Sequence, residues 1–396
     1  MMHMDAEMAV TLPRGFDDTE FETRTRRVQK MMADERLDAV FFTTEPNVRY
    51  YSGFFTQFWE SPTRPWFLVI PAHGKPIAVI PEIGASGMAV TWIDDIRTWA
   101  SPNPLDDGIS LLVDLLNSLP RTYGRIGATM GIESRIRMPL NNFLELSQRL
   151  TGFELVDIAA HIHRLRSVKS AAEIEKIRKA CNIAHKGFTN IPNHARIGKT
   201  EREICTQMHI DMLQAGADAV KYLIAGSGPD GYDSIIMGPT DRILEHSDVL
   251  IIDTGAVYDG YFCDFDRNFA FGRPSDETLR AYDVVYRATD AGFEAARPGA
   301  TTTDIFHAMW TIMEAGGALG NDVGRLGHGL GIELTEWPSN TASDNTPLVP
   351  GMVITLEPGM TYSSGKQMVH EENIVITEDG AEYLSIRCPS ELPIID

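Results

Sequence analysis

The stretch from residue 253 to residue 267 constrains the fold of this chain more than any other. It follows an apolar, β-branched run, Val249–Ile252, which is typical of a buried strand. Asp253 comes directly after this run, where an ionised carboxylate is costly to bury unless it is paired. Gly255 and Gly260 allow a turn, so a second short run, Val257–Phe262, can return antiparallel and bring Asp264 to the same end of a hairpin as Asp253.

Asp253 and Asp264 are therefore candidate metal ligands. Two carboxylates that lie a few ångströms apart raise each other's pKa unless a metal ion sits between them. A structural alternative stays open at this point. Asp253 could cap a turn at the end of a strand, and Asp266 and Arg267 could form a surface ion pair.

Length and composition set the broad class of the chain. Its 396 residues suggest two or three domains, and its apolar content of 43% and charged content of 23% are those of an ordinary globular protein. The net charge of −20 argues against nucleic acid and anionic membranes as partners. The four cysteines are scattered without a C-x-x-C motif, and no signal peptide is recognised in residues 1–17, so we expect a cytoplasmic protein without disulfides.

The order of apolar patterns predicts an α/β fold class, in the broad sense that includes α+β, with a domain boundary after residue 163. Residues 1–163 are expected to form a small α/β domain in which the aromatic segment up to Trp59 is a loop. Its expected helices are 18–36, 105–119 and 140–150, and its strands are 39–42, 67–70 and 76–80.

Residues 164–396 are expected to form the second domain. A capping-box pattern at Ser170 predicts the start of its first helix. The expected helices are 171–189, 200–215, 275–296 and 303–315, and the strands lie within 221–270 and at 352–357 and 368–377.

Three further residues carry possible ligand side chains in unusual places. His328 is flanked by two glycines, Glu357 ends an apolar strand, and Glu371 lies within a strand that is otherwise apolar. Ordinary alternatives are a core histidine and a solvent-facing position on an edge strand. With Asp253 and Asp264 they would make four carboxylates and one imidazole, a hard ligand set that suits two divalent ions of the manganese, iron, cobalt or zinc type.

The ordered set of motifs resembles the pita-bread metallohydrolases, which include prolidase, aminopeptidase P, methionine aminopeptidase and creatinase. The spacings of 11 residues from Asp253 to Asp264 and of 29 from His328 to Glu357 are similar to those of this superfamily. The resemblance implies a small N-terminal creatinase-like α/β domain followed by a C-terminal pita-bread domain. The matching motifs are Arg164–Glu173, Pro239–Arg242, Asp253–Gly255, Asp264, Arg297–Gly299, Gly327–Gly329, Leu356–Gly359 and Glu371.

The resemblance also implies a metal site. Two divalent ions would be bound, with iron expected first and manganese, zinc or cobalt as alternatives. Glu372 is the register alternative for the last ligand. The implied ligands are Asp253, Asp264, His328, Glu357 and Glu371.

Three positions depart from the pattern of the peptidases in this superfamily. Ile236 and Thr335 stand where those peptidases carry histidines that handle the amide carbonyl and the leaving amine. Asp266 stands where they carry a threonine. The simplest interpretation is a different reaction on the same metal platform.

One branch of the superfamily, the DddP-type dimethylsulfoniopropionate lyases, carries out such a reaction, and residues 50–66 and 335–337 are similar to it. The chain is therefore expected to be a metal-dependent carbon–sulfur lyase that eliminates dimethyl sulfide and leaves acrylate. The alternative is an Xaa-Pro dipeptidase or aminopeptidase. A creatinase-like amidine hydrolase and an inactive binding module are further alternatives, the last disfavoured because all five ligands are present.

The lyase hypothesis assigns further residues. The leading candidates for the general base are Asp266 and Glu336, and Glu333 and Asp233 are secondary candidates. The small zwitterionic sulfonium substrate would need an aromatic cage for its cation. A homodimer is also expected, because in creatinase-like relatives the N-terminal segment that corresponds to the one carrying Phe54, Phe58 and Trp59 closes over the partner subunit's site. The candidate cage residues are Trp337, Trp59, Phe54 and Phe58.

Overall fold

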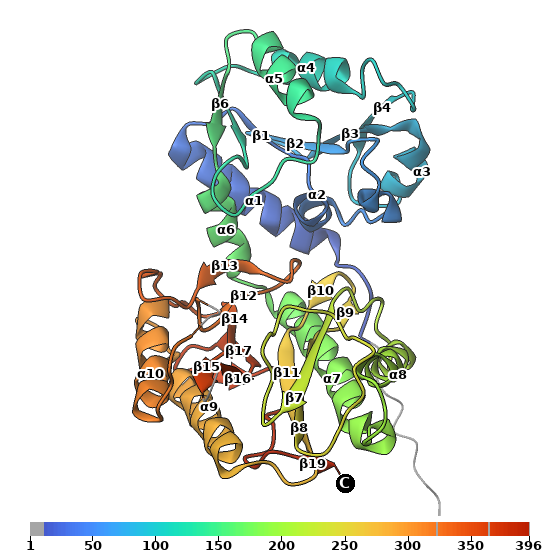
Figure 1. The fold of residues 1–396 in the computed structure, drawn as a ribbon. Coiled ribbons are helices and arrows are strands. Elements are labelled where there is room, and N and C mark those ends of the chain that lie inside the picture. The colour runs from blue at the N-terminus through green and yellow to red at the C-terminus, as the bar shows by residue number, and fades with distance from the viewer. Residues whose placement is uncertain (1–11, 322–323, 363–364, 396) are drawn as a thin grey trace, which may run out of the picture. The chain divides into compact units, whose positions relative to one another are not determined.

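The chain forms two compact units in a computed structural model, Met1–Leu165 and Arg166–Asp396 (Figure 1). The structure describes residues 12–321, 324–362 and 365–395. The expectation about a signal peptide concerns residues that fall mostly outside this range. Among the described residues, no helix is both long and apolar enough to cross a membrane.

The first unit is built on a mixed six-stranded sheet with the order β4-β3-β2-β1-β5-β6 (Figure 1). Every residue of the central strand β1 is buried, as its unbroken apolar sequence predicts. Helices α4 and α5 cover one face of the sheet and contribute leucines to its core. The strands are β1 (Ala39–Phe42), β2 (Phe67–Pro71), β3 (Ile77–Pro81), β4 (Asp95–Trp99), β5 (Arg125–Ala128) and β6 (Glu154–Asp157).

Helices α1, α4 and α5 lie close to the predicted positions, whereas α2, α3 and α6 were not predicted. The aromatic segment expected as a loop contains α2 and a short 3-10 turn, Gln57–Glu60. Pro46 lies in the first turn of α2, where its missing N–H removes no helical hydrogen bond. The α-helices are α1 (Asp18–Glu35), α2 (Glu45–Ser52), α3 (Ala85–Met88), α4 (Ile109–Ser118), α5 (Leu140–Arg149) and α6 (Ala159–Ser167), the last of which runs into the second unit.

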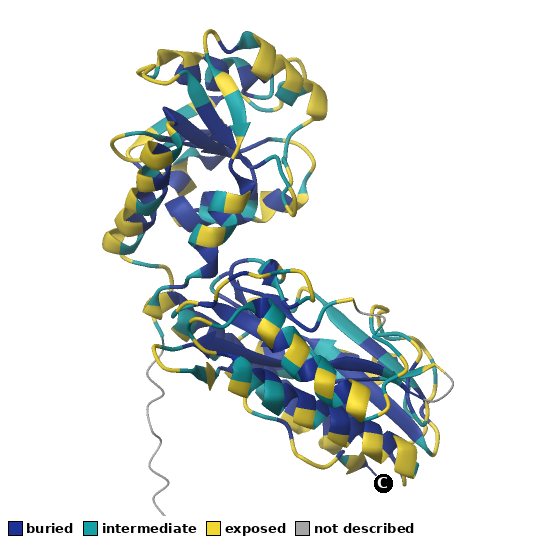
Figure 2. Ribbon diagram, turned by 90° about the vertical axis from the view of Figure 1, so that its left-hand side faces the viewer, coloured by how far each residue is buried: buried dark blue, intermediate teal, exposed yellow. Residues whose placement is uncertain are grey.

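The second unit contains two sheets, each with a pair of helices beside it (Figure 1). Its helices turn buried faces inward and exposed faces outward (Figure 2). Ser170 caps α7 with the predicted capping box. The helices are α7 (Ala171–His194) and α8 (Glu201–Gln214) beside the first sheet, and α9 (Asp276–Ala295) and α10 (Thr302–Ala315) beside the second.

The strands of the second unit are arranged as follows. The first sheet has the order β19-β11-β8-β7, with β7 (Leu223–Pro229), β8 (Asp248–Thr254), β11 (Phe265–Phe271) and β19 (Ile394–Ile395). The second has the order β13-β12-β14-β17-β18, with β12 (His328–Gly329), β13 (Glu336–Ser339), β14 (Val353–Leu356), β17 (Glu372–Ile376) and β18 (Ala381–Tyr383). Two small ribbons complete the unit: β9 (Val257–Tyr258) with β10 (Tyr261–Phe262), and β15 (Gly359–Tyr362) with β16 (Lys366–Val369).

An antiparallel return follows residue 253 as predicted, but β11 makes it, and the run at 257–262 predicted to return does not pair with β8. Strands β8 and β11 pair antiparallel, with Asp253 opposite Asp266, and the ribbon β9–β10 makes the turn between them. Gly255 is needed there because a Cβ atom would lie 1.6 Å from the carbonyl oxygen of Cys263. The register places Asp253 and Asp266 on one face of the sheet, since directly opposed side chains point the same way.

The prediction of a single strand at 368–377 is wrong. The chain leaves β16 at Val369 and enters β17 at Glu372, and these two strands belong to different sheets. His370 and Glu371 lie in the break, where the backbone N–H of His370 donates to the carbonyl of Pro358. The break separates Glu371 from the regular strand geometry and turns its side chain toward the residues described next.

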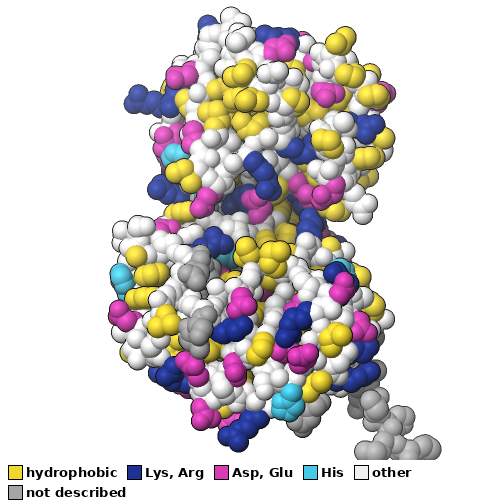
Figure 3. Space-filling model, in the orientation of Figure 1, with side chains coloured by type: hydrophobic (Ala, Val, Ile, Leu, Met, Phe, Trp, Pro, Cys, Tyr) yellow, Lys and Arg dark blue, Asp and Glu magenta, His cyan; other side chains and the backbone are white. Residues whose placement is uncertain are grey.

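Acidic and basic side chains are intermixed over the face of the molecule shown in Figure 3. The large negative net charge of the chain is therefore not gathered into one patch on that face. All four cysteines are buried and free, in keeping with the expected absence of disulfides.

Candidate metal centre

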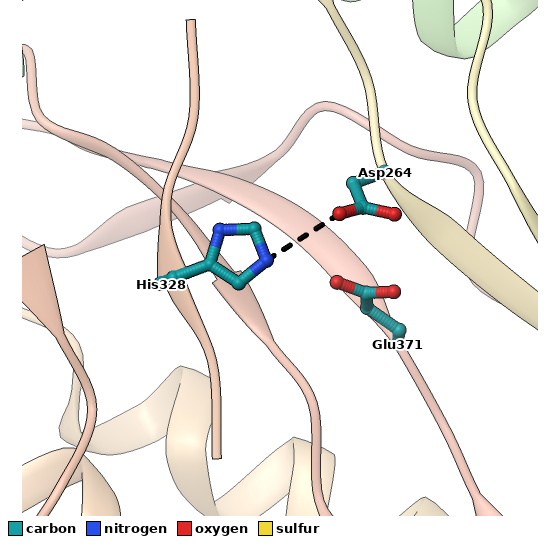
Figure 4. Close-up of side chains that lie close together, drawn as sticks. All are labelled: Asp264, His328 and Glu371. Atoms are coloured by element: carbon teal, nitrogen blue, oxygen red, sulfur yellow. Dashed lines mark ion pairs between the residues drawn. The ribbon is translucent and has the colours of Figure 1, made fainter. Parts of the chain in front are cut away.

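The five predicted ligands come from the ends of strands in both sheets of the second unit. Asp253 lies in β8 and Asp264 directly before β11, while His328 begins β12 and Glu357 follows β14. Glu371 lies in the break between β16 and β17. Asp264, His328 and Glu371 are all buried, and they offer ligand atoms that lie within 4.8 Å of one another (Figure 4).

The imidazole of His328 is oriented by its own backbone. Its Nδ1 lies 2.8 Å from the carbonyl oxygen of Gly329, which can only accept, so Nδ1 carries the proton. The other nitrogen, Nε2, faces Asp264 Oδ2 at 3.4 Å and is the ring atom that could bind a metal ion. Gly327 is required before it, because its φ of +131° is rare for other residues and a Cβ would lie 2.2 Å from the carbonyl of Thr355.

Asp264 is held by two residues that sequence reasoning missed. The side chain of Asn373 accepts from the backbone N–H of Asp264 at 3.0 Å and donates to its carbonyl. The hydroxyl of Tyr222 donates to Asp264 Oδ1. Burial and the charges of nearby carboxylates raise the pKa of Tyr222 well above its usual value, which keeps this donor protonated. A buried asparagine inside the apolar run of β17 was a detectable signal, whereas Tyr222 had none.

Several carboxylate oxygens of the cluster lack a partner among the described protein groups. Among the described residues, Asp253 Oδ1, Glu357 Oε2 and Glu371 Oε1 are buried and have no hydrogen-bond partner. Buried polar atoms are normally paired, and an unpaired buried carboxylate is especially costly. These orphaned oxygens, together with one imidazole nitrogen, fit the donor set that divalent cations of the manganese, iron, cobalt or zinc type prefer.

Burial and the charges of neighbouring groups shift the pKa values of the cluster upward. Burial raises the pKa of Asp253 and of Glu371 well above the usual range, and the neighbouring carboxylates add to it. Burial raises the pKa of Glu357 to about 7, and the charge of Asp264 acts in the same direction. Burial alone would lower the pKa of His328, but its hydrogen bond to Asp264 and the charge of Asp264 raise it. Bound cations would reverse the repulsion that causes these shifts.

Glu371 and Glu372, the two register alternatives, have opposite environments. The carboxylate of Glu372 accepts from Arg267 Nη2 at 3.1 Å, from the backbone N–H of Cys388 at 3.0 Å and from the hydroxyl of Ser385. Glu371 Oε1 has no such partner within the described chain. The geometry therefore favours Glu371 as the ligand and gives Glu372 a structural role.

The two candidate bases also differ. Burial would raise the pKa of Glu336, but Arg166 at 2.5 Å and Lys169 at 3.0 Å lower it to about 2. A carboxylate of such low pKa is a weak proton acceptor. Asp266 is fully buried, and burial raises its pKa well above the usual range although the charge of Arg267 acts against this. Asp266 is thus the better suited of the two to take a proton.

The other residues named from the sequence are placed as follows. Glu333 accepts from Arg166 at 2.8 Å, and Asp233 is exposed and pairs with Lys366 at 2.9 Å. Ile236 is 77% exposed, and Thr335 is exposed and accepts a hydrogen bond from Arg325 Nη2 at 3.5 Å.

The aromatic residues proposed for a cation cage lie in different units. In the first unit, the rings of Phe54 and Trp59 lie 5.1 Å and 5.9 Å from that of Trp66, and both residues are buried in its core. Phe58 is more exposed and lies against Arg64. Trp337 belongs to β13 of the second unit and packs against its core. Within either unit these rings do not form a cage, so the cage stays a prediction.

Known proteins resemble this chain in both of its units. The family model for metallopeptidase family M24 matches residues 175–378, and the model for the creatinase/prolidase N-terminal domain matches residues 24–168. The chain is 29% identical over 387 residues to a probable dipeptidase PepE from Mycobacterium tuberculosis, covering 96% of this chain and 98% of that protein. It is 30% identical over 369 residues to an Xaa-Pro dipeptidase from Pyrococcus furiosus, covering 91% and 97%. The crystal structure of dipeptidase PepE from Mycobacterium ulcerans is similar, with a TM-score of 0.83, 28% identity and coverage of 96% and 99%.

Replacing Asp264 by alanine should remove bound metal. Asp264 is the acid nearest to His328 Nε2, so its loss should lower the metal content from about two ions per chain to fewer than about one. Elemental analysis of dialysed protein measures this. Glu378→Ala, at an exposed acid outside the cluster, is the matched control. Full metal stoichiometry in Asp264→Ala would remove this residue from the ligand set.

The stability of the metal-free protein should fall as the pH rises. The pKa of Glu357 is 4.5 in its usual state and about 7 in the fold, so between these values the folded chain binds more protons than the unfolded chain. The free energy of unfolding therefore decreases from about pH 4.5 to about pH 7. The raised pKa values of Asp253, Glu371 and His328 act in the same direction. Melting curves of chelator-treated protein at a series of pH values check this, and Glu357→Gln should flatten the decline. A melting temperature that rises over this range would contradict the assignment.

Proposed function

This chain belongs to metallopeptidase family M24, and from that premise we propose that it is a metal-dependent peptidase of the Xaa-Pro dipeptidase type. The observation that carries the proposal is the buried cluster of Asp264, His328 and Glu371. Its neighbours Asp253 and Glu357 have buried oxygens with no hydrogen-bond partner among the described residues. Full-length similarity to proteins named as dipeptidases supports a short peptide as the substrate. We further propose two divalent ions as the cofactor, iron, manganese, zinc or cobalt, and a homodimer as the working state. Elemental analysis and light scattering test these two proposals.

The residues of this chain supply three of the requirements for hydrolysis. Asp253, Asp264, His328, Glu357 and Glu371 would hold two divalent ions, which would supply Lewis-acid chemistry for the scissile carbonyl and for water. Tyr222 and Asn373 hold Asp264 in place, which keeps the ligand geometry fixed. We propose Asp266, which lies opposite Asp253 in the register and whose pKa is raised by burial, as the proton acceptor.

A second candidate function comes from the two positions that lack histidine. Ile236 and Thr335 offer no imidazole to protonate a leaving amine. Elimination of dimethyl sulfide from dimethylsulfoniopropionate needs no such acid, because the leaving group departs as a neutral molecule. In that reaction Asp266 would remove the proton next to the carboxylate, and the metal ions would stabilise the developing negative charge. The similarity to dipeptidases makes this the second candidate and peptide hydrolysis the first.

One substrate panel separates the two functions. The purified protein, loaded with each of the four metals in turn, is given Xaa-Pro dipeptides, other dipeptides and dimethylsulfoniopropionate. We expect release of free amino acids from a dipeptide, abolished by chelation and restored by metal. Dimethyl sulfide in the headspace without peptide cleavage would replace the first candidate by the second. Activity on neither substrate class with any of the metals would contradict both.

Amide variants of the two buried acids test the proton acceptor. Asp266→Asn should lower kcat by roughly 10²–10⁴-fold while the metal content is retained. Glu336→Gln should act on stability, because it weakens buried ion pairs whose disruption costs about 3–5 kcal/mol. Turnover, metal content and melting temperature are measured for both. A fully active Asp266→Asn enzyme would exclude the proposed role.

A further inference from the structure

The edge of β16 that faces away from β15 ends two residues before the ligand Glu371. Gly359 and Val369 are directly opposed in the β15–β16 ribbon, and the hydrogen bond from the backbone N–H of His370 to the carbonyl of Pro358 flanks this pair. In this antiparallel pattern the N–H and C=O groups of Val369 point away from β15. They therefore need hydrogen-bond partners outside the ribbon.

Two buried side chains bind both of these groups. The backbone N–H of Val369 donates to the hydroxyl of Tyr232 at 2.7 Å, and its carbonyl accepts from Asn268 Nδ2 at 2.7 Å. Two residues earlier on the same edge, the backbone N–H of Gln367 donates to the carbonyl of Tyr232 at 2.8 Å. Tyr232 is 1% exposed and Asn268 is 2% exposed, so these bonds lie where water does not compete for them. Tyr232 and Asn268 are together called the Val369 clamp below.

The Val369 clamp connects the first sheet of the second unit to the segment that carries Glu371. Asn268 lies in β11 of that sheet, and Tyr232 lies in the segment that follows β7 of the same sheet. Strand β16 belongs to a separate ribbon, so these side chains take the place of the ladder bonds that a neighbouring strand would make. The clamped edge ends at Val369, and Glu371 follows before β17 begins.

The position of Glu371 depends on the backbone on either side of it. Oε1 of Glu371 has no hydrogen-bond partner among the described residues, so no protein contact fixes that oxygen. On one side, Glu372 is fixed by its ion pair with Arg267 at 3.1 Å. On the other side, Val369 is fixed by the clamp. A ligand that is held in place before metal binds lowers the cost of binding the metal.

We propose that Tyr232 and Asn268 are positioning residues, which act through Glu371 to raise the affinity of the centre for divalent metal. Neither residue needs to touch the metal or the substrate in this role. The inference rests on the proposed two-metal cofactor. Loss of a residue that orients a metal ligand typically lowers metal affinity by about 10- to 100-fold.

The test removes one hydroxyl. Tyr232→Phe loses only the oxygen that accepts from the backbone N–H of Val369. Titration calorimetry of metal-free protein with Mn²⁺ should show two binding events in the wild type, one of them weakened by about 10- to 100-fold in the variant. At saturating Mn²⁺, kcat should return to the wild-type value, because the ligand set is intact. Asn268→Leu should weaken the same binding event, but kcat is compared only for Tyr232→Phe, because Asn268 Nδ2 also lies 3.5 Å from Asp266 Oδ1.

Tyr362→Phe is the matched control. Tyr362 is also 1% exposed and lies in β15 of the same ribbon, but its hydroxyl donates to the carbonyl of Asp230. This variant should lower the melting temperature, as Tyr232→Phe does, and leave the affinity for Mn²⁺ unchanged. Wild-type Mn²⁺ affinity in Tyr232→Phe would overturn the inference. A kcat that stays low at saturating Mn²⁺ would also overturn it, since Tyr232 would then act on the reaction itself.

Amide hydrogen exchange of the metal-free protein separates this inference from the proposed cofactor. Exchange at Val369–Glu371 should be faster in Tyr232→Phe than in the wild type or in Tyr362→Phe, because the clamp no longer protects this segment. If the wild type binds no Mn²⁺, the proposed cofactor fails, while this difference in exchange still supports the positioning of Glu371 by the clamp. The same exchange rate in all three proteins would refute the clamp whether or not metal binds.

Discussion

The mutual repulsion of buried carboxylates is the constraint on which the second unit depends. Asp253 and Asp264 lie close together in the sequence, whereas Glu357 and Glu371 come from a distant part of the chain. The fold brings the four together, with Asp264 and Glu371 buried and Asp253 and Glu357 partly buried. Such a set of like charges is unfavourable unless the groups are protonated or bind cations. Two divalent ions would convert this repulsion into the interaction that ties the two sheets together, so metal binding and stability are linked in this account.

The acids around the cluster fall into two groups, those that pair with protein groups and those left available to bind metal. Glu371 and Glu372 are neighbours in sequence, yet one has an orphaned oxygen and the other is satisfied by Arg267, Ser385 and Cys388. The same distinction applies to the acids considered as bases. Glu336 is neutralised by two buried cations, whereas Asp266 is not fully neutralised by the one arginine that follows it. The acids that lack full pairing, Glu371 and Asp266, are therefore the candidates for metal binding and proton transfer.

Much of this arrangement could be predicted from the sequence because it depends on local signals. An apolar run that ends before Asp253, followed by two glycines, predicted an antiparallel return, although β11 and not the run at 257–262 pairs with β8. Periodicity and capping predicted most helices, including α7 with its cap at Ser170. The motifs indicated the pita-bread metallohydrolases, and the match to the family model for metallopeptidase family M24 supports this.

The remainder depends on contacts between distant residues, which a single sequence does not reveal. Arg166 and Lys169 reach Glu336 across more than 160 positions, so the low basicity of that acid had no local sign. The break at His370 and Glu371 lies inside an apolar pattern that predicts one continuous strand, and tertiary contacts decide otherwise. Tyr222, which precedes β7, contacts Asp264, which precedes β11, because both strands pair with β8.

The most direct test of the central claim is anomalous X-ray diffraction from crystals of the metal-loaded protein, recorded at the absorption edge of the bound metal. The account predicts two peaks about 3.5–4 Å apart, as in other two-metal sites, within reach of Asp253, Asp264, His328, Glu357 and Glu371. A structure in which these carboxylates pair with protein groups and no peak lies among them would contradict it.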